Sequence, residues 1–309
     1  MNQTARFAAI VLAAGRGSRF GGEAGRPFPK VLRPVLGRPM VRWVLDALRG
    51  AGIDDITLIV GFGADQVRRE IGPSVRYVVQ TEQKGSGHAV ACAKDTFDAY
   101  RGSLVVMCGD SPLFTSETIR RIADQHVLAG AVVTLASARL DDPTGYGRIV
   151  RDSHGRIVAI VEEKCASDRE KAIREVNGGI YAFDARWLFG SIDKMAINEV
   201  GEYNLTDMVR VAIEQGRTVS AIECDPSELL GVNTPDQLAE VEATLRGRRS
   251  MKMTKRKIRL EDGRYLIYFE FSEKPAFQIS DCISRIDAED GGYDYGSDTD
   301  KEADKGVRA

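Results

Sequence analysis

The sequence predicts an α/β protein built around an open, mostly parallel β-sheet. The first indication is residues 7–13, a continuous apolar run that is typical of a strand buried on both faces. The second is the alternation of such runs with segments of helical periodicity, because parallel strands need a crossover between them, usually a helix. The third is composition, since 43% of the 309 residues are hydrophobic, enough to build a large core. Ligands of such sheets bind at the carboxyl ends of the strands.

The elements are expected in the following order. Strands are predicted at residues 7–13, 55–60, 76–80, 103–108 and 131–138, and helices at residues 39–49, 65–71, 87–97 and 115–126. Residues 148–162 hold two strand-like runs around Ser153, His154 and Gly155, which predicts a β-hairpin that interrupts the alternation and forms a substrate-side subdomain. A strand at residues 218–223 and a helix at residues 235–245 are expected to complete the main domain.

Composition changes abruptly after Leu245. Residues 246–259 hold eight basic residues and no acidic ones, and residues 265–271 have the pattern of a strand. Residues 281–309 hold nine acidic and four basic residues and few hydrophobic side chains that could form a core, so we expect a disordered tail. The expected parts are a catalytic domain over residues 1–248, a basic linker with a small β appendage over residues 249–280, and the acidic tail.

Charge and cysteine usage argue against several classes of protein. The formal net charge of −2 at pH 7 shows no basic excess of the kind that binds nucleic acid. The apolar run at residues 7–14 is too short to cross a bilayer and does not lead into a signal-peptide cleavage region, so neither membrane insertion nor secretion is expected. The five cysteines stand singly, without zinc-site spacing or disulfide density, which fits a reducing cytoplasm.

A glycine-rich loop follows the first predicted strand. Residues 12–19 leave that strand and enter a segment whose glycines let backbone N–H groups approach phosphate oxygens. The loop lacks the Gly-Lys-Ser/Thr of a P-loop, and Phe20 stands where the dinucleotide fingerprint has its third glycine. Arg19 and Lys30 add two cations nearby, as a triphosphate requires. The sequence therefore predicts a local nucleotide-phosphate site, with solvated surface cations as the alternative.

Further motifs follow in the order seen in one enzyme family. They are LAAGRGSR (12–19), PK (29–30), QTEQKGSGHA (80–89), GDSPL (109–113), DDPTGYGRI (141–149), VEEK (161–164), VNGGI (176–180), GEYNLTD (201–207) and GVN (231–233). Over residues 6–248 the chain resembles the uridyltransferase domain of bacterial N-acetylglucosamine-1-phosphate uridyltransferases. The resemblance implies a Rossmann-like nucleotide-diphospho-sugar transferase fold. It also implies the reaction of UTP with N-acetylglucosamine 1-phosphate to give UDP-N-acetylglucosamine and pyrophosphate, with Mg²⁺ as cofactor.

The resemblance further implies roles for individual residues. Arg19, Lys30 and Asp110 are expected to act in catalysis, and Asp110 and Asn233 to coordinate Mg²⁺. The residues expected to contact the nucleotide are Leu12, Ala13, Ala14, Gly15, Gln80, Gln83, Gly85 and Ser86. The residues expected to hold the amino sugar are Gly147, Glu162 and Asn177. Amide side chains suit a nucleobase or a sugar because they both donate and accept hydrogen bonds, and Mg²⁺ prefers oxygen ligands.

The substrates imply how the reaction proceeds. The sugar phosphate oxygen is already anionic at neutral pH, so it attacks the α-phosphorus in line without a general base, and pyrophosphate leaves. Mg²⁺, Arg19 and Lys30 position the reactants and offset developing charge. His88, His126 and His154 are expected to be structural or exposed.

The chain departs from the family at several positions. Residues 19–30 form a longer segment than in the family. Cys108 stands where the family has a tyrosine, and Gly178 where it has a threonine, so the identity of the sugar is less secure than the type of reaction. Nothing after Leu245 resembles the family's hexapeptide-repeat acetyltransferase domain, so acetylation is not expected and no oligomeric state can be inherited.

Two alternatives remain open at this point. The first is a nucleotidyltransferase for another sugar 1-phosphate or for dTTP. Asn233 weighs against it, because many such relatives use a second aspartate as metal ligand. The second is a non-catalytic sugar-nucleotide sensor, which could lose Lys30 or Asp110 without penalty.

Overall fold

The structure is a computed structural model that describes residues 6–15, 28–199, 201–232, 234–250, 253–259 and 265–271. Residues 1–245 and 246–309 form two compact units. In the second unit, β12 (Met253–Arg259) pairs antiparallel with β13 (Tyr265–Phe271). The sequence predicted the second of these strands and missed the first. The predicted acidic tail lies outside the described residues, and the three-part division of the chain stays a prediction.

The first unit contains one nine-stranded sheet with β1 (Phe7–Ala13) near its middle. Its main path has the order β11-β7-β10-β6-β1-β4-β5. The bounds of the other strands on this path are β4 (Ile56–Val60), β5 (Arg76–Val79), β6 (Ser103–Cys108), β7 (Val133–Arg139), β10 (Glu175–Asp184) and β11 (Val219–Glu223). Neighbours on the path pair in parallel, except that β10 runs antiparallel to β6 and β7. The predicted α/β class with a mostly parallel, mixed sheet is confirmed.

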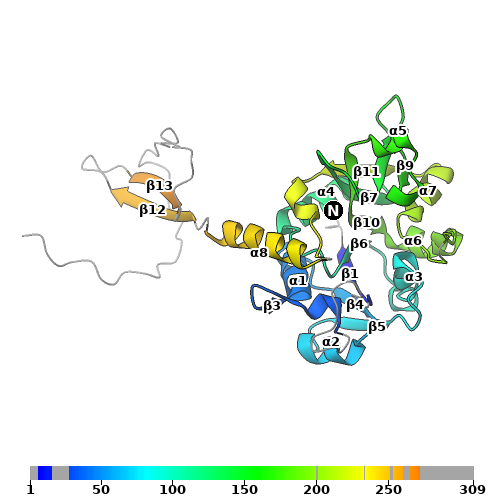
Figure 1. Ribbon diagram of the computed structural model, residues 1–309. Coiled ribbons are helices and arrows are strands. Elements are labelled where there is room, and N and C mark those ends of the chain that lie inside the picture. Colours follow the sequence, from blue (N-terminus) through cyan, green and yellow to red (C-terminus); the bar gives the residue numbers. More distant parts are fainter. Residues whose placement is uncertain are drawn as a thin grey trace, which may run out of the picture. The chain divides into compact units, whose positions relative to one another are not determined.

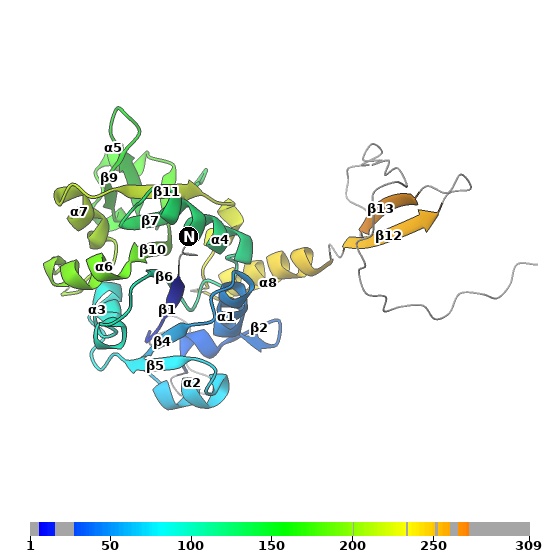
Figure 2. The same ribbon diagram turned by 180° about the vertical axis from the view of Figure 1, so that it is seen from behind.

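Alternate residues of β1 face two separate hydrophobic clusters. Ala9 and Val11 belong to the cluster that α1 (Met40–Gly50), α2 (Ala64–Ile71) and α4 (Ser116–Leu128) cover. Ala8 and Ile10 belong to the cluster that α3 (Ser86–Ala91), α6 (Ala185–Ser191) and α7 (Asp207–Glu214) cover. Helices therefore cover both faces of the sheet (Figures 1 and 2). A strand buried on both sides has to be apolar at every position, which explains the continuous apolar run in the sequence.

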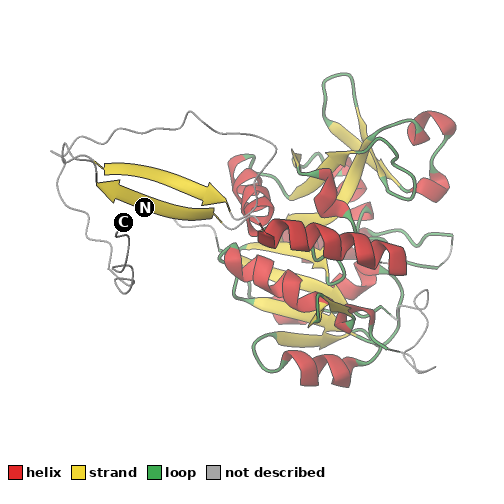
Figure 3. Cartoon of the chain, turned by 60° about the vertical axis from the view of Figure 1, so that its left-hand side comes forward, coloured by secondary structure: helices red, strands yellow, loops and turns green. Residues whose placement is uncertain are grey.

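The chain reverses its direction of winding at β1. It passes from β1 to β4 and β5 on one side of the sheet, and then crosses to β6 on the other side of β1. The register pairs Leu12 with Cys108, so β1 and β6 end side by side. The helices lie against the strands (Figure 3), and the space beyond the carboxyl ends of these two strands is the usual ligand site of an open sheet.

A β-hairpin attaches to the main sheet through β10. Its strands, β8 (Arg148–Arg151) and β9 (Ile157–Val161), pair antiparallel, and Arg148 pairs with Val176 of β10. Asp152 Oδ1 accepts hydrogen bonds from the backbone N–H groups of His154 and Arg156, both at 2.9 Å. This local bonding closes the turn. The predicted hairpin is confirmed.

The remaining elements are short, apart from the helix α8. They are β2 (Pro34–Val35), β3 (Arg38–Pro39), α5 (Asp168–Lys171), α8 (Pro235–Ser250) and 3₁₀ turns at Lys30–Leu32, Asp95–Phe97, Glu163–Cys165, Ile192–Lys194 and Pro226–Leu229. The helix expected at residues 87–97 ends at Ala91, because the N–H groups of Ala93 and Lys94 bond three residues back and tighten the chain. Among the described residues, no helix is both long and apolar enough to cross a membrane.

Candidate active site

Lys30 and Asp110 meet beyond the carboxyl ends of β1 and β6. Asp110 follows β6 after one glycine, and Lys30 opens a 3₁₀ turn. Lys30 Nζ and Asp110 Oδ2 form an ion pair, and the two side chains are 14% and 27% exposed. Partial burial strengthens such a pair because less water screens it. Two of the expected catalytic side chains are therefore in contact.

Gly109 allows the chain to turn closely over β1 before Asp110. Its N–H donates to the backbone oxygen of Leu12 at 2.9 Å, and a Cβ at this position would lie 3.1 Å from both that oxygen and Val31 Cγ1. The backbone oxygen of Asp110 accepts from the N–H of Val232 at 3.4 Å. This bond brings Val232 next to Asp110. Two other predicted residues, Arg19 and Asn233, lie outside the described residues.

A hollow of about 260 Å³ opens beside this pair. It is lined by predicted nucleotide and catalytic residues from four separate segments: Leu12, Ala14, Gly15, Lys30, Gln80, Gln83, Gly85, Ser86 and Asp110. Ala13 is the exception, because its side chain is buried in the core on one face of the sheet. Any contact that Ala13 makes with a ligand must therefore come from its backbone.

Gln80 is held in place at the floor of this hollow. The side chain is buried, and its Nε2 donates to the backbone oxygen of Gly85 at 3.1 Å and lies 3.0 Å from His88 Nδ1. Both N–H groups of the amide thus have partners, which leaves the carbonyl oxygen for a ligand. His88 has a structural role, as expected for the histidines.

Gly85 and Ser86 connect the nucleotide segment to the segment at residues 203–206. A Cβ on Gly85 (φ +94°) would lie 2.5 Å from the backbone oxygen of Tyr203, so only glycine fits this turn. The N–H of Gly87 donates to that same oxygen at 2.8 Å, and Ser86 Oγ accepts from the N–H of Leu205 at 3.0 Å. The Ser86 hydroxyl still carries its own proton for a ligand.

A second hollow, of about 100 Å³, adjoins the first. Both are lined by Leu12, Ser86 and Cys108. Glu162, which follows β9, also lines the second hollow, and its Oε1 accepts from Thr206 Oγ1 at 3.1 Å. Gly147 and Asn177 are not among the residues that line this hollow. Gly147 lies close to Glu162, since a Cβ there would sit 3.5 Å from Glu162 Oε2 and 3.2 Å from Ile160 Cγ2. Because Gly147 has no side chain, the Oε2 side of the Glu162 carboxylate stays open.

Asn177 lies on β10 beside Gly147. Its backbone N–H donates to the oxygen of Gly147 at 2.8 Å. Its side-chain Nδ2 donates to Tyr181 Oη at 2.6 Å, and its Oδ1 accepts from the N–H of Gly179 at 3.2 Å. The three expected sugar residues thus cluster on β10 and the hairpin.

Cys108 separates the two hollows. Burial raises the pKa of its thiol to about 12, so the sulfur is protonated near neutral pH and is a poor nucleophile. The four cysteines within the described part of the chain are all free. Cys108 therefore contributes shape to the site.

Comparison with known proteins identifies the family. Residues 9–176 match the model of the MobA-like NTP transferase domain. The chain belongs to the MobA-like NTP transferase family. It is 44% identical over 244 residues to the bifunctional protein GlmU of Pelotomaculum thermopropionicum, covering 78% of this chain and 52% of that protein. It is also 44% identical over 250 residues to the bifunctional protein GlmU of Trichlorobacter lovleyi, covering 80% and 54%.

The NTP transferase spans about half the length of these curated relatives. A structure from Bacillus anthracis, in complex with sucrose and assigned as a glucose-1-phosphate thymidylyltransferase, aligns with a TM-score of 0.63 at 24% identity. It covers 78% of this chain and 96% of that one. This likeness concerns the fold alone. The resemblance inferred from the motifs and the predicted fold are both confirmed.

Asp110 is a suitable ligand for a divalent cation. Asp110 Oδ2 is paired with Lys30, while Oδ1 has no hydrogen bond or ion pair to another described residue and could bind a metal. The described residues hold no group of three or more His, Cys, Asp or Glu side chains arranged around a metal. Mg²⁺ needs few protein ligands, because it keeps several waters and bonds to substrate phosphates. The Asp110 carboxylate fits such a cation.

Three residues that shape the site were not predicted from the sequence. Thr206 lies in a quoted motif, but nothing marked it as the partner of Glu162. His88 and Tyr181 gain their importance from neighbours that only the folded chain provides. Their contacts depend on a tight turn and on an irregular strand, neither of which has a strong sequence signal.

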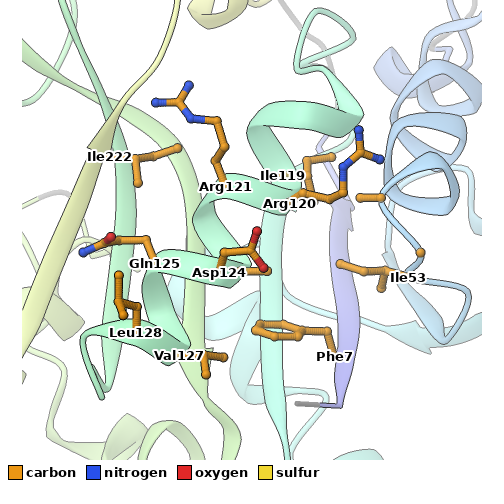
Figure 4. A pocket seen from close by; sticks show the side chains of 13 residues that line it. Phe7, Ile53, Ile119, Arg120, Arg121, Asp124, Gln125, Val127, Leu128 and Ile222 are labelled. Atoms are coloured by element: carbon orange, nitrogen blue, oxygen red, sulfur yellow. The ribbon is translucent and has the colours of Figure 1, made fainter. Parts of the chain in front are cut away.

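A larger hollow, of about 880 Å³, lies along α4 (Figure 4). It is lined by residues of α4 together with Phe7 of β1, Ile53 and Ile222 of β11. Its two arginines already donate to backbone oxygens: Arg120 to Gly50 and Arg121 to Glu223. Size alone does not make it the active site, since neither Lys30 nor Asp110 is near it.

Proposed function

We propose that this NTP transferase joins UTP to N-acetylglucosamine 1-phosphate, forming UDP-N-acetylglucosamine and pyrophosphate. The observation that carries the proposal is the Lys30–Asp110 pair, which borders a hollow that adjoins a second one. One hollow suits a nucleotide and the other a sugar. The identity to the GlmU proteins supports the same pair of substrates.

The transfer requires one bond to form and one to break. An oxygen of the sugar phosphate attacks the α-phosphorus of UTP, and the bond from that phosphorus to the bridging oxygen breaks, so that pyrophosphate leaves with the bonding electrons. No proton transfer is needed, because the attacking oxygen is already anionic. Lys30 would neutralise phosphate charge, with Arg19 as a second proposed cation. Backbone groups at Ala14 and Gly15 would fix the triphosphate.

A bound Mg²⁺ would supply charge neutralisation at the phosphates. We propose that Asp110 and Asn233 hold it. The geometry that supports Asp110 is its position at the end of β6 and the open Oδ1. A cation at Oδ1 would compete with Lys30 for the charge of Asp110 and weaken their pair, so that Lys30 could turn toward phosphate oxygens.

The second hollow suits an N-acetylated sugar in its chemistry. Glu162 would accept hydrogen bonds from sugar hydroxyls. Asn177 lies behind the wall, bonded to the lining residue Tyr181, and a sugar that reaches it would find its remaining donor and acceptor sites. The wall contains apolar side chains of Leu12, Val106 and Leu205, which suit a methyl group. UTP and sugar phosphates are too highly charged to cross a bilayer unaided, so the proposal favours a cytoplasmic location.

The test is pyrophosphate release with Mg²⁺, UTP and N-acetylglucosamine 1-phosphate. Parallel reactions would contain glucosamine 1-phosphate, glucose 1-phosphate, or dTTP in place of UTP. Asp110→Asn should lower turnover by about a hundredfold or more, since it removes a charge that binds the metal. The matched control is Asp141→Asn, because Asp141 is fully exposed and lies outside the site.

Each outcome of this test has a distinct meaning. Turnover with the acetylated sugar that Asp110→Asn removes and Asp141→Asn preserves would support the proposal. Preference for glucose 1-phosphate or dTTP would keep the reaction type and overturn the substrate. Binding of UDP-N-acetylglucosamine without turnover of any pair would favour a sensor.

A further inference from the structure

An irregularity in β10 brings Asn177 and Tyr181 together. Asn177 pairs with Ser137 of β7, and Tyr181 pairs with Leu135, so four steps along β10 match two along β7. In a regular strand, residues four apart would be separated by about 13 Å. The bulge shortens this separation and turns both side chains toward each other, with Nδ2 and Oη only 2.6 Å apart.

Two glycines make this bulge possible. Gly179 has φ +76°, a conformation that glycine adopts without strain. A Cβ on Gly178 would lie 2.9 Å from the backbone oxygen of Ala136. A side chain at position 178 would therefore collide with β7. The close packing of β10 against β7 therefore requires the glycine that this chain has at position 178 in place of the family's threonine.

The hydrogen bonds around Asn177 have a fixed direction. The N–H of Gly179 donates to Oδ1 at 3.2 Å, so a flipped amide would set Nδ2 against another donor. Nδ2 must therefore donate to Tyr181, and Oη must accept. The phenol proton then needs an acceptor of its own, and none is recorded for it within the described part of the chain.

This proton belongs to a buried group that lines the second hollow. Tyr181 is 4% exposed and borders the hollow together with Glu162. Burial raises its pKa above the usual range, so the hydroxyl stays protonated at working pH. A buried donor without an acceptor costs about 1–3 kcal/mol, and native proteins rarely leave one without a reason. A ligand oxygen in the hollow would satisfy it.

We propose that Tyr181 binds the sugar substrate, donating its hydroxyl proton to the carbonyl oxygen of the acetamido group. The inference rests on the proposed function. An amide carbonyl can only accept a hydrogen bond, as this donor requires. The free amine of glucosamine 1-phosphate is an ammonium near neutral pH and can only donate. Tyr181 therefore selects for the acetylated sugar, and its bond from Asn177 orients the hydroxyl.

The test is Tyr181→Phe, which removes one oxygen atom. The variant keeps the aromatic ring, whose centroid lies 5.6 Å from that of Phe183. We expect the KM for N-acetylglucosamine 1-phosphate to rise about tenfold while the KM for UTP stays unchanged. Selectivity for this sugar over glucosamine 1-phosphate should fall by a similar factor. Tyr77→Phe is the matched control, because it removes a tyrosine hydroxyl that donates to the backbone oxygen of Gly72 and lines neither hollow.

Direct binding of each sugar phosphate, measured by calorimetry, separates the possible failures. Wild-type turnover with an unchanged sugar KM and selectivity in Tyr181→Phe would overturn the role of Tyr181 and leave the proposed function standing. An equal rise in both KM values, or a loss of stability alone, would also overturn it. Absence of both turnover and binding in the wild type would refute the proposed function, and the role of Tyr181 with it.

Discussion

Lys30 and Asp110 neutralise each other at the carboxyl ends of β1 and β6, although 80 positions separate them in the sequence. The carboxylate proposed to hold the metal and the amine proposed to hold phosphate are thus partners in the ligand-free protein. When a metal–nucleotide complex binds, the Lys30–Asp110 ion pair would be replaced by two contacts, one between Asp110 and the metal and one between Lys30 and a phosphate. Metal and nucleotide should therefore each strengthen the binding of the other.

Removal of Lys30 should separate metal binding from catalysis. In Lys30→Met, Asp110 loses its partner and the site loses a positive charge, so Mn²⁺ should bind the free protein about tenfold more tightly. Turnover should fall by about a hundredfold or more, because phosphate charge is no longer neutralised. Calorimetry with Mn²⁺ and a pyrophosphate assay would measure the two effects.

Lys94→Met provides the matched control, because Lys94 pairs with Asp193 at 3.0 Å on an exposed surface. Both its Mn²⁺ affinity and its turnover should equal those of the wild type. An unchanged Mn²⁺ affinity in Lys30→Met would mean that the ion pair does not compete with the metal.

The hydrogen bond from Thr206 to Glu162 should matter for the sugar and not for the nucleotide. Thr206→Val keeps the shape of the side chain and removes the donor, so Glu162 loses one of the contacts that orient it. We expect the KM for the sugar phosphate to rise about fivefold, with the KM for UTP unchanged. Thr206→Ser should restore the wild-type value. A change in the UTP KM of the same size would contradict this assignment.

The positions of Lys30 and Asp110 could be predicted because they depend on strong sequence patterns. Buried parallel strands are continuously apolar, as β1 and β6 are, and a chain that alternates such strands with helices puts their carboxyl ends together. Asp110 comes one glycine after β6, so this pattern places it at the edge of the sheet. Lys30 lies well beyond the end of β1, so its expected position depended on the motif resemblance, and only the folded chain shows its contact with Asp110.

The position of Tyr181 could not be predicted in the same way. The segment around Gly178 and Gly179 has the composition of a turn, so the ten-residue strand β10 was not predicted. Pairing with β6 and β7 on both sides overrides this local preference. The bulge that joins Asn177 to Tyr181 depends on that pairing, so its effect appears only in three dimensions.

Gly85 should tolerate no side chain because of space as well as backbone conformation. Gly85→Ala would set Cβ 2.5 Å from the backbone oxygen of Tyr203, and we expect a loss of at least about 3 kcal/mol in the free energy of unfolding. Gly52→Ala is matched in conformation, since Gly52 has φ +84° but faces open space. It should cost only about 1 kcal/mol. Urea unfolding of both variants would separate the two effects, and equal losses would contradict the steric explanation.

His126 should make the protein less stable in mild acid. The imidazole is buried, its Nδ1 lies 3.1 Å from Thr134 Oγ1, and burial lowers its pKa from 6.5 to about 4. Between these two values the unfolded chain binds a proton that the folded protein excludes, so stability falls as pH falls. The loss from pH 7 to pH 5 should be about 2 kcal/mol.

Urea unfolding at the two pH values would measure this loss. His126→Gln should remove most of it, since glutamine can bond to Thr134 without titrating. His154→Gln should retain it, because His154 lies exposed in the turn of the hairpin. If wild type and His126→Gln lost equal stability between pH 7 and pH 5, other groups would have to account for the acid sensitivity. The difference between the two histidine variants therefore isolates the contribution of the buried ring.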